Sequence, residues 1–401
     1  MCRDQDDRWL ARTLELARQG AGRVEPNPRV GAVIVKAGEL VASGFHRNYG
    51  SLHAERAALS AAEPDLVRGA TLYCNLEPCS HRSPRKKQPP CTEAIIAAGI
   101  GRVVIGHRDP NPAVRGEGIR ALERAGITVD VRGEDADESP FLRENEVFNT
   151  VMALGRPFVH LKAAISLDGR LATTGGDSRW ITDGEARTAA HRLRAESDAV
   201  LVGRGTVEAD DPLLTVRLPA GEVQGSSPAP RPVVLDSLAR ISLESRLVRE
   251  RGNELLLCLG PDAPERRRAA LEARGVTVLE AEGVGGLDPA SVLKCLGTAG
   301  IRSVFVEGGA QILTAFLRAR LYDRLSLYFA PILLGRGREA VGDLSVATVV
   351  QALNFESVRW ETIGRQQCFT GLRAGWQEEI LGVLRESERE RTKGGPQCSR
   401  D

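Results

Sequence analysis

Residues 74–91 read CNLEPCSHRSPRKKQPPC, and this stretch sets the local fold around two of its cysteines. The apolar segment that leads into Cys79 predicts a strand over 71–76. Cys91 follows two prolines and begins the run CTEAIIAAG, which predicts a helix over 91–98. A thiol in the turn after a strand and a thiol at a helix start suit metal binding. We therefore interpret the stretch as part of a metal site.

The segment HAE, residues 53–55, supplies the rest of this site and begins a predicted helix over 53–62. In the first turn of a helix, side chains two positions apart can both reach past the helix end. A histidine with a glutamate two positions later, followed by Pro-Cys and a second cysteine, is typical of zinc deaminases. We predict that zinc is held by three ligands and that Glu55 is the general acid/base. The ligands are His53, Cys79 and Cys91.

This ligand set predicts a catalytic metal. One imidazole and two thiolates leave the fourth tetrahedral position open for water, whose pKa zinc lowers toward roughly 7. Glu55 would carry a proton from that water to a leaving amine, so the predicted reaction is hydrolytic deamination of an amino-substituted ring. A structural zinc with Cys74 as fourth ligand is the alternative, although a strand position favours a core role for Cys74. Taken singly, such residues are usually helix starts and small core side chains.

The composition fits a cytoplasmic enzyme of more than one domain. The chain has 401 residues, of which 42% are hydrophobic, enough for two or more domains. Its 54 basic and 53 acidic residues leave a formal charge of +1, so the overall field does not attract nucleic acid. The N-terminal segment is charged from residue 3 onward and has no long apolar run. Eight scattered cysteines do not form a disulfide scaffold.

Strands that alternate with helices predict two layered α/β domains. An acidic, helical run that ends in Gly-Arg-Pro suits the connection between them. We predict a first domain over 1–147, a linker over 148–156, a second domain over 157–385 and a disordered tail over 386–401. The expected elements are helices over 8–19, 53–62, 91–98, 117–125 and 184–195, a hairpin over 30–46, and strands over 71–76, 101–107, 127–131, 198–203, 232–236, 254–259, 276–279, 302–306 and 325–334.

The motifs EPNPRVGAVIV, HAE and NLEPCSH…PPC resemble the deaminase half of the bifunctional riboflavin-biosynthesis deaminase/reductase family, over nearly all of residues 8–131. The resemblance implies a cytidine-deaminase-like three-layer domain that deaminates 2,5-diamino-6-(5-phosphoribosylamino)pyrimidin-4-one. It also implies that Asn27 and His46 bind the pyrimidine. Judged from the sequence alone, Asn27 between two prolines could be a turn residue and His46 could simply end a strand.

The sequence departs from this family between Cys79 and Cys91. The family usually has a short loop, SH-x-G-[RK]-T-PP, whereas SHRSPRKKQPP is three residues longer and lacks the glycine. The basic residue that would face the substrate therefore has no assignable position. Candidates for a contact with the substrate phosphate or ring, each with a solvated loop as its alternative, are Arg82, Arg85, Lys86 and Lys87.

Four later motifs resemble the reductase half of the same family, in the same order, over about 157–376: KAAISLDGRLAT, DSRWIT, GRGTVEADDPLLTVR and FVEGGAQIL. The resemblance implies a dihydrofolate-reductase-like α/β domain that uses NADPH to reduce the ribosyl group of the deaminated intermediate to a ribityl chain. The NADPH contacts that it implies are Ala164, Trp180, Thr206, Asp210 and Gly309. The substrate contacts that it implies are Ser178, Arg194, Leu214, Arg217 and Glu307.

The residues themselves are compatible with this second site. The run SVFVEGG before AQILTAFLRA predicts a strand, a glycine pair and a helix, whose amides suit a pyrophosphate, although any such turn can use glycine. Arg194 and Arg217 suit a phosphate because guanidinium groups pair bidentately with its oxygens, and ordinary surface charges are their alternative. Asp168 is predicted to be a turn residue. Because the cofactor carries the hydride, no acid is assigned.

These observations predict an enzyme that uses one zinc ion and NADPH on a small phosphorylated pyrimidine, without nucleic-acid or membrane partners. The resemblance further implies a homo-oligomer, and LSLYFAPILL (325–334) is a candidate edge strand. The alternative is a nucleic-acid or nucleoside zinc deaminase with an accessory reductase-like domain, against which the near-zero net charge counts. A further alternative is a zinc scaffold, or a chain with one inactive half.

Overall fold

The computed structural model describes residues 3–82, 88–135, 138–178, 181–219 and 229–393. Within these residues, contacts divide the chain into two compact units. The first runs to Gly155 and is completed by the residues from Gln377 onward. The second runs from Arg156 to Trp376.

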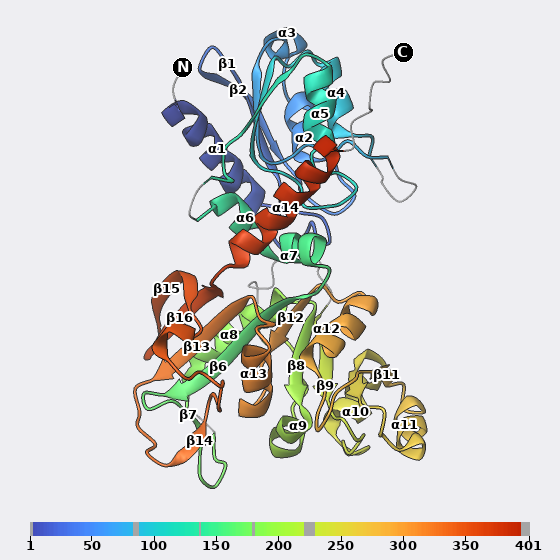
Figure 1. Ribbon diagram of the computed structural model, residues 1–401, viewed down its shortest axis with the longest axis vertical. Coiled ribbons are helices and arrows are strands. Elements are labelled where there is room, and N and C mark those ends of the chain that lie inside the picture. Colours follow the sequence, from blue (N-terminus) through green and yellow to red (C-terminus); the bar gives the residue numbers. More distant parts are fainter. Residues whose placement is uncertain (1–2, 83–87, 136–137, 179–180, 220–228, 394–401) are drawn as a thin grey trace. The chain divides into compact units, whose positions relative to one another are not determined.

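The first unit is a three-layer α/β structure (Figure 1). Its elements are α1 (Arg3–Arg18), β1 (Gly31–Lys36), β2 (Glu39–Phe45), α2 (Ala54–Ser60), α3 (Pro64–Val67), β3 (Thr71–Leu76), α4 (Cys91–Ala97), β4 (Arg102–His107), α5 (Glu117–Arg124), β5 (Thr128–Val131), α6 (Pro140–Glu144) and α7 (Glu146–Leu154). The sheet order is β2-β1-β3-β4-β5, with β3, β4 and β5 mutually parallel. Helices α1 and α6 pack on one face of this sheet, and α2, α4 and α5 pack on the other.

The order of these elements follows from short sequence signals. The hairpin turns at Ala37 and Gly38, both at positive φ, as predicted. Strand β1 reads GAVIVK and is buried on both faces, because helices cover the sheet on both sides. A Cβ atom on Gly31 would lie 2.2 Å from the carbonyl oxygen of Thr13, so glycine lets α1 approach the sheet closely. The strand predicted over 71–76 is β3, and it leads directly into Pro78 and Cys79.

The second unit is built on a larger sheet with helices on both faces (Figure 1). Its strands are β6 (Phe158–Ser166), β7 (Arg170–Thr173), β8 (Ala199–Gly203), β9 (Arg231–Leu235), β10 (Leu256–Leu259), β11 (Thr277–Glu280), β12 (Ser303–Val306), β13 (Arg324–Ala330), β14 (Gly337–Glu339), β15 (Phe355–Ile363) and β16 (Gln366–Arg373). Its helices are α8 (Gly184–Ala195), α9 (Arg204–Asp210), α10 (Arg246–Arg251), α11 (Glu265–Glu272), α12 (Pro289–Thr298) and α13 (Ala310–Arg318), with short 3-10 turns at Gly252–Glu254 and Val349–Gln351. The sheet order is β11-β10-β9-β8-β12-β6-β13-β16-β15, parallel from β11 through β13 and antiparallel beyond. Strands β14 and β7 form a separate small sheet.

The candidate edge strand is an interior strand. Strand β13 pairs with β6 on one side and with β16 on the other. The hairpin of β15 and β16, which the sequence pattern did not indicate, covers the side that was expected to be free. The outer strands of the described sheet are therefore β11 and β15.

The structure also differs from the predicted division into domains. Most of the predicted linker over 148–156 is helix α7, which belongs to the first unit. The predicted tail begins inside helix α14 (Trp376–Lys393), which is helical rather than disordered as far as it is described. Apolar side chains bury one face of α14, and its residues from Gln377 belong to the first unit, not to the second domain predicted over 157–385. None of the described helices is long and apolar enough to cross a membrane.

Candidate active sites of the two units

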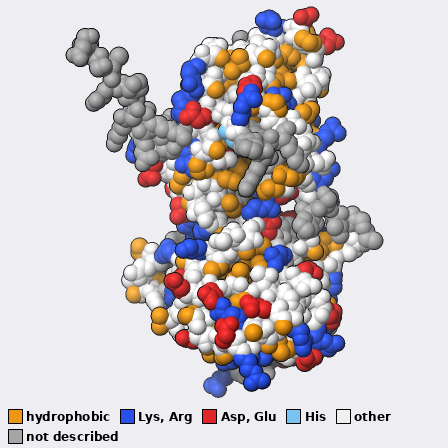
Figure 2. All heavy atoms as spheres, turned by 90° about the vertical axis from the view of Figure 1, so that its right-hand side faces the viewer, with side chains coloured by type: hydrophobic (Ala, Val, Ile, Leu, Met, Phe, Trp, Pro, Cys, Tyr) orange, Lys and Arg blue, Asp and Glu red, His pale blue; other side chains and the backbone are white. Residues whose placement is uncertain are grey.

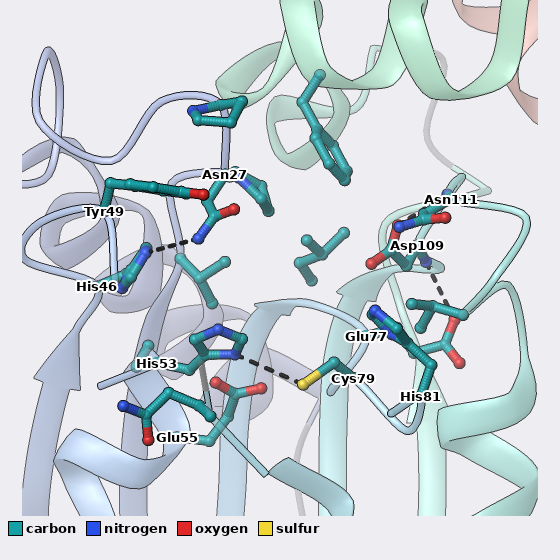
Figure 3. Close-up of a pocket in the computed structure, with 18 of the residues that line it drawn as sticks. Asn27, His46, Tyr49, His53, Glu55, Glu77, Cys79, His81, Asp109 and Asn111 are labelled. Atoms are coloured by element: carbon teal, nitrogen blue, oxygen red, sulfur yellow. Dashed lines mark hydrogen bonds between the residues drawn. The ribbon is translucent and has the colours of Figure 1, made fainter. Parts of the chain in front are cut away.

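The three predicted zinc ligands form one cluster in the first unit, and two of them, His53 and Cys79, line a pocket (Figure 3). His53 is the residue before helix α2, Cys79 lies in the turn after β3, and Cys91 is the first residue of α4. The Nδ1 atom of His53 lies 3.5 Å from Cys79 Sγ and 3.4 Å from Cys91 Sγ. One nitrogen and two sulfurs, all within 4.8 Å of one another, are a donor set that suits tetrahedral zinc.

The surroundings of Cys91 disfavour the ionised form of its thiol. The hydrogen bond with Cys79 and burial raise the pKa of Cys91 well above its usual range. The backbone N–H of Cys91 also donates to Cys79 Sγ over 3.4 Å, which fixes the two sulfurs together. The position of Cys91 at a helix start does not offset this rise in its pKa, and a bound cation is what would stabilise two buried thiolates.

Glu55 lies beside this trio as the second residue of α2 and is buried. Burial raises the pKa of Glu55, and the nearby charge of Cys79 raises it further. A carboxyl group with a raised pKa can both accept and donate a proton near neutral pH. Cys74 is also buried, but it packs in the core between sheet and helices, as predicted, and is not in the metal-binding cluster.

Asn27 and His46 form a polar pair on one side of the pocket (Figure 3). His46 Nδ1 lies 3.0 Å from the carbonyl oxygen of Leu52, which can only accept, so Nδ1 carries the proton. His46 Nε2 then accepts a hydrogen bond from Asn27 Nδ2 over 3.2 Å. Burial lowers the pKa of His46, which is consistent with this neutral ring. The pairing fixes the amide of Asn27, so that its oxygen faces the pocket.

Sequence reasoning missed the opposite side of this pocket. Asp109 and Asn111 line it from the loop after β4 (Figure 3). Because β3 and β4 are parallel neighbours, the residues that follow them meet at one edge of the sheet, and the run HRDPNP could have been identified on that ground. Helix α7 contributes Phe148 and Met152 to the lining, from a segment that was assigned to a linker.

Glu77 joins the two sides of the pocket. It lies two residues before Cys79, and its buried carboxylate accepts four backbone N–H groups, two from the loop after β4 and two from the first turn of α5. The donors are Asp109 at 3.0 Å, Gly116 at 2.9 Å, Gly118 at 2.8 Å and Ile119 at 3.2 Å. This single side chain therefore ties the pocket loop to the turn that carries a zinc ligand.

The basic loop is only partly described. Arg82 makes a bidentate ion pair with Glu93 in the first turn of α4, with Nη2 at 2.7 Å from both carboxylate oxygens. That contact occupies the guanidinium group at the surface. Arg85, Lys86 and Lys87 lie outside the described residues. His81 and Gln88 line the pocket from either side of that segment.

Four of the five predicted NADPH residues lie on neighbouring parallel strands of the second unit or in the segments that follow them. Ala164 lies on β6, Thr206 and Asp210 lie on α9 after β8, and Gly309 precedes α13 after β12. Strands β8, β12 and β6 are parallel neighbours, so their carboxyl ends meet. No described atom lies within 4 Å of where a Cβ on Gly309 would be, which leaves the backbone open to a ligand. Trp180 lies outside the described residues.

Among the predicted substrate residues, Arg194 links Glu307 to the segment that carries Leu214 and Arg217. Arg194 Nε donates to Glu307 over 2.8 Å, and Arg194 Nη1 donates to the carbonyl oxygen of Thr215 over 2.9 Å. The Leu214 side chain is buried in the core, so only its backbone could contact a ligand. Arg217 lies in the same segment, whereas Ser178 is exposed in the loop after β7.

The sequence prediction did not single out Lys162 on β6 as a candidate site residue. A lysine inside the apolar run FVHLKAAIS is unusual and could have indicated one. Burial lowers the pKa of Lys162, and the charge of Glu307 opposes that shift. Asp168 is a turn residue, as predicted. Its carboxylate accepts the backbone N–H groups of Leu334 and Gly335.

Fold and site define a class of protein: a zinc deaminase domain joined to a reductase domain. Residues 3–107 match the family model for the cytidine and deoxycytidylate deaminase zinc-binding region, and residues 157–369 match the RibD C-terminal domain. The chain is 39% identical to the riboflavin biosynthesis protein RibD of Aquifex aeolicus, over 91% of this chain and 97% of that protein. It is 40% identical to RibD of Escherichia coli K12, over 82% and 89% respectively.

Solved structures agree with these matches. Form 1 of Acinetobacter baumannii RibD has a TM-score of 0.78 at 34% identity and covers 92% of this chain and 99% of its own. A Thermotoga maritima protein described as a diaminohydroxyphosphoribosylaminopyrimidine deaminase/5-amino-6-(5-phosphoribosylamino)uracil reductase has a TM-score of 0.72 at 35% identity, with the same coverage. The chain belongs to the RibD family of bifunctional riboflavin biosynthesis enzymes. Its predicted fold, a cytidine-deaminase-like domain followed by a dihydrofolate-reductase-like domain, and its predicted cofactors, zinc and NADPH, are thereby confirmed.

Proposed function

We propose that the first unit deaminates 2,5-diamino-6-(5-phosphoribosylamino)pyrimidin-4-one and that the second unit reduces the ribosyl group of the product to a ribityl chain. The description of the Thermotoga relative supports both substrates. The observation that carries the proposal is the cluster of His53, Cys79 and Cys91 at a pocket that His53, Cys79 and Glu55 line.

In the first unit, we assign the metal to the imidazole and the two thiolates. Bound there, zinc would supply a water that is activated for attack on the amino-bearing ring carbon. Glu55, buried beside the ligands, is placed to hold a proton from such a water and would return it to the departing amine. The Asn27 oxygen, fixed by His46, accepts a hydrogen bond from the pyrimidine. Asp109 and Asn111 face the rest of the substrate.

In the second unit, NADPH supplies the hydride. We assign the edge formed by Thr206, Asp210 and Gly309 to the cofactor. Arg194, paired with Glu307, and the neighbouring Arg217 bind the phosphorylated substrate. Ala164, Trp180 and Ser178 keep the contacts that the family resemblance implies, and Leu214 contributes its backbone alone.

The test uses the purified chain and the diaminopyrimidinone substrate. Ammonia release without NADPH and a ribityl product only with NADPH are expected. A Glu55→Gln variant should release no ammonia but should still oxidise NADPH when given pre-formed deaminated pyrimidine. Full ammonia release by that variant would refute the assigned proton carrier. Ammonia release by a chain from which a chelator has removed zinc would refute the proposal that the deamination requires the metal.

A small-molecule substrate also fits the surface charge better than a nucleic acid does. Lys and Arg side chains are interspersed with Asp and Glu on the described face in Figure 2, in line with the near-zero net charge. Salt-dependent binding of single-stranded RNA would argue for the alternative.

We further propose a cytoplasmic homo-oligomer that uses strand β15. This outer strand exposes Trp360 and Val358, and an outer strand can pair with another copy of itself. A Trp360→Lys variant should lower the molar mass measured by sedimentation. A wild-type chain that sediments as a monomer would refute the assembly.

A further inference from the structure

The segment 211–217 of the second unit has a strained backbone. Asp211 and Leu214 have φ values of 41° and 51°, in the left-handed region that side chains larger than glycine disfavour. Such conformations persist where the surrounding structure imposes them, and they concentrate at binding sites. The direction of the chain at Leu214 determines where Thr215 and Arg217 lie. The side chains that impose this conformation therefore determine the positions of the predicted substrate residues in the segment.

Arg251, the last residue of α10, holds the segment by hydrogen bonds from one side. Its guanidinium is buried, and each of its five N–H groups has an acceptor. Nη1 donates to the carbonyl oxygens of Leu213 at 2.9 Å and Leu214 at 3.2 Å. Nη2 donates to Pro230 O at 3.0 Å and to the Glu254 carboxylate, which also accepts from Nε. Three of the five bonds thus go to backbone carbonyls, two of them at the strained position.

Side chains of helix α8 form hydrogen bonds with the same segment from another side. His191 Nδ1 accepts the backbone N–H of Arg217 over 3.2 Å. One turn further along α8, Arg194 donates to Thr215 O while it pairs with Glu307. The segment is thus held between α8 and α10, at backbone atoms on either side of Thr215.

We propose that Arg251 is a positioning residue of the reductase site, with His191 as its counterpart on α8. Arg251 holds 211–217 in the strained conformation in which Arg217 and the Leu214 backbone meet the phosphorylated pyrimidine. Stability alone is a weak reason for a buried guanidinium, since apolar replacements of buried charges are often at least as stable. Its fork geometry matches two adjacent carbonyls, which a lysine ammonium cannot reproduce. The inference rests on the proposed function of the second unit.

The experiment is steady-state reduction of pre-formed deaminated pyrimidine by the full-length zinc-loaded chain, for wild type, Arg251→Lys and Arg249→Lys. Arg249 is exposed on the same helix and is the matched control. We expect Arg251→Lys to raise KM for the pyrimidine about tenfold or more, with kcat within about threefold and NADPH affinity unchanged. Ammonia release shows that the first unit is intact, and thermal unfolding of the full chain shows whether the second unit is folded. A structural role would lower kcat or melting temperature and leave KM unchanged.

A folded Arg251→Lys variant with KM within twofold of wild type would overturn the inference. If that variant does not fold, His191→Leu and His191→Gln decide. Leucine removes the acceptor for Arg217 and should raise KM, whereas glutamine offers a carbonyl oxygen and should restore it. Equal KM values for the two variants would overturn the inference. A wild-type chain that releases ammonia but never oxidises NADPH with the deaminated pyrimidine would refute the proposed reductase function itself.

Discussion

Replacing Glu77 with glutamine tests how the deaminase pocket is held together. The Oε2 atom of Glu77 accepts from the amides of Asp109 and Gly116, and Oε1 accepts from the amides of Gly118 and Ile119. Glutamine keeps one acceptor atom and turns the other into a donor, so two backbone N–H groups, one buried and one part-buried, lose their partner and face an N–H group instead. At about 1–3 kcal/mol for each unsatisfied buried donor, the expected loss is about 2–6 kcal/mol. Domains are typically stable by about 5–15 kcal/mol, so this is a large fraction.

The assay combines urea unfolding of the full chain with ammonia release, which reports on the first unit. Zinc content measured on the same samples shows whether the turn that carries Cys79 has moved. Glu117→Gln is the control, since Glu117 lies in the same region but pairs with Arg120 and Arg124 at the surface. The free energy of unfolding of Glu117→Gln should fall by no more than about 1 kcal/mol. A Glu77→Gln variant that loses less than about 1 kcal/mol and keeps full ammonia release would refute the reasoning.

Three further changes probe the first unit. Asp6→Asn removes a buried carboxylate that binds two arginines and a tyrosine. The free energy of unfolding should fall by roughly 3 kcal/mol, and an unchanged thermal unfolding transition would contradict this. Burial lowers the pKa of His107 to about 4, against about 6.5 in the unfolded chain, so only the unfolded chain binds this proton between those pH values. The free energy of unfolding should therefore fall as pH drops through this window, and His107→Asn should flatten the fall by up to about 1.4 kcal/mol per pH unit; equal slopes in urea unfolding would refute it. In Gly44→Ala the new Cβ would lie 2.5 Å from a backbone nitrogen of α2, so we expect a loss of about 1–3 kcal/mol and, by metal analysis, less bound zinc at His53.

The clustering of His53, Cys79 and Cys91 could be predicted because each of these residues lies at a recognisable element boundary. His53 and Cys91 start helices, and Cys79 follows a buried strand, so local pattern was enough to bring them together. Asp109 and Asn111 could not be found in this way, because their role depends on which strands are neighbours. Leu214 shows a different limit, since a motif names a position but does not say whether its side chain or its backbone faces the ligand.

Helices α7 and α14 were misjudged for a compositional reason. Each lies in a stretch rich in charged residues, which suggested a linker and a disordered tail. In α14 a few apolar residues, Ile380, Leu381 and Leu384, are buried and recur at helical spacing amid many charges. An average over the segment hides such a narrow stripe, whereas the three-dimensional contacts show it at once.

The return of α14 to the first unit has a consequence for genetic dissection. The deaminase unit consists of two separate stretches, so in chain order the reductase unit is an insertion within it. A cut at residue 147 would remove Phe148 and Met152 from the pocket lining and would also discard the C-terminal helix. A free-standing deaminase would therefore have to be built by fusing residues 3–155 to 377–393 through a short artificial linker, whereas 156–376 could be excised as one continuous piece.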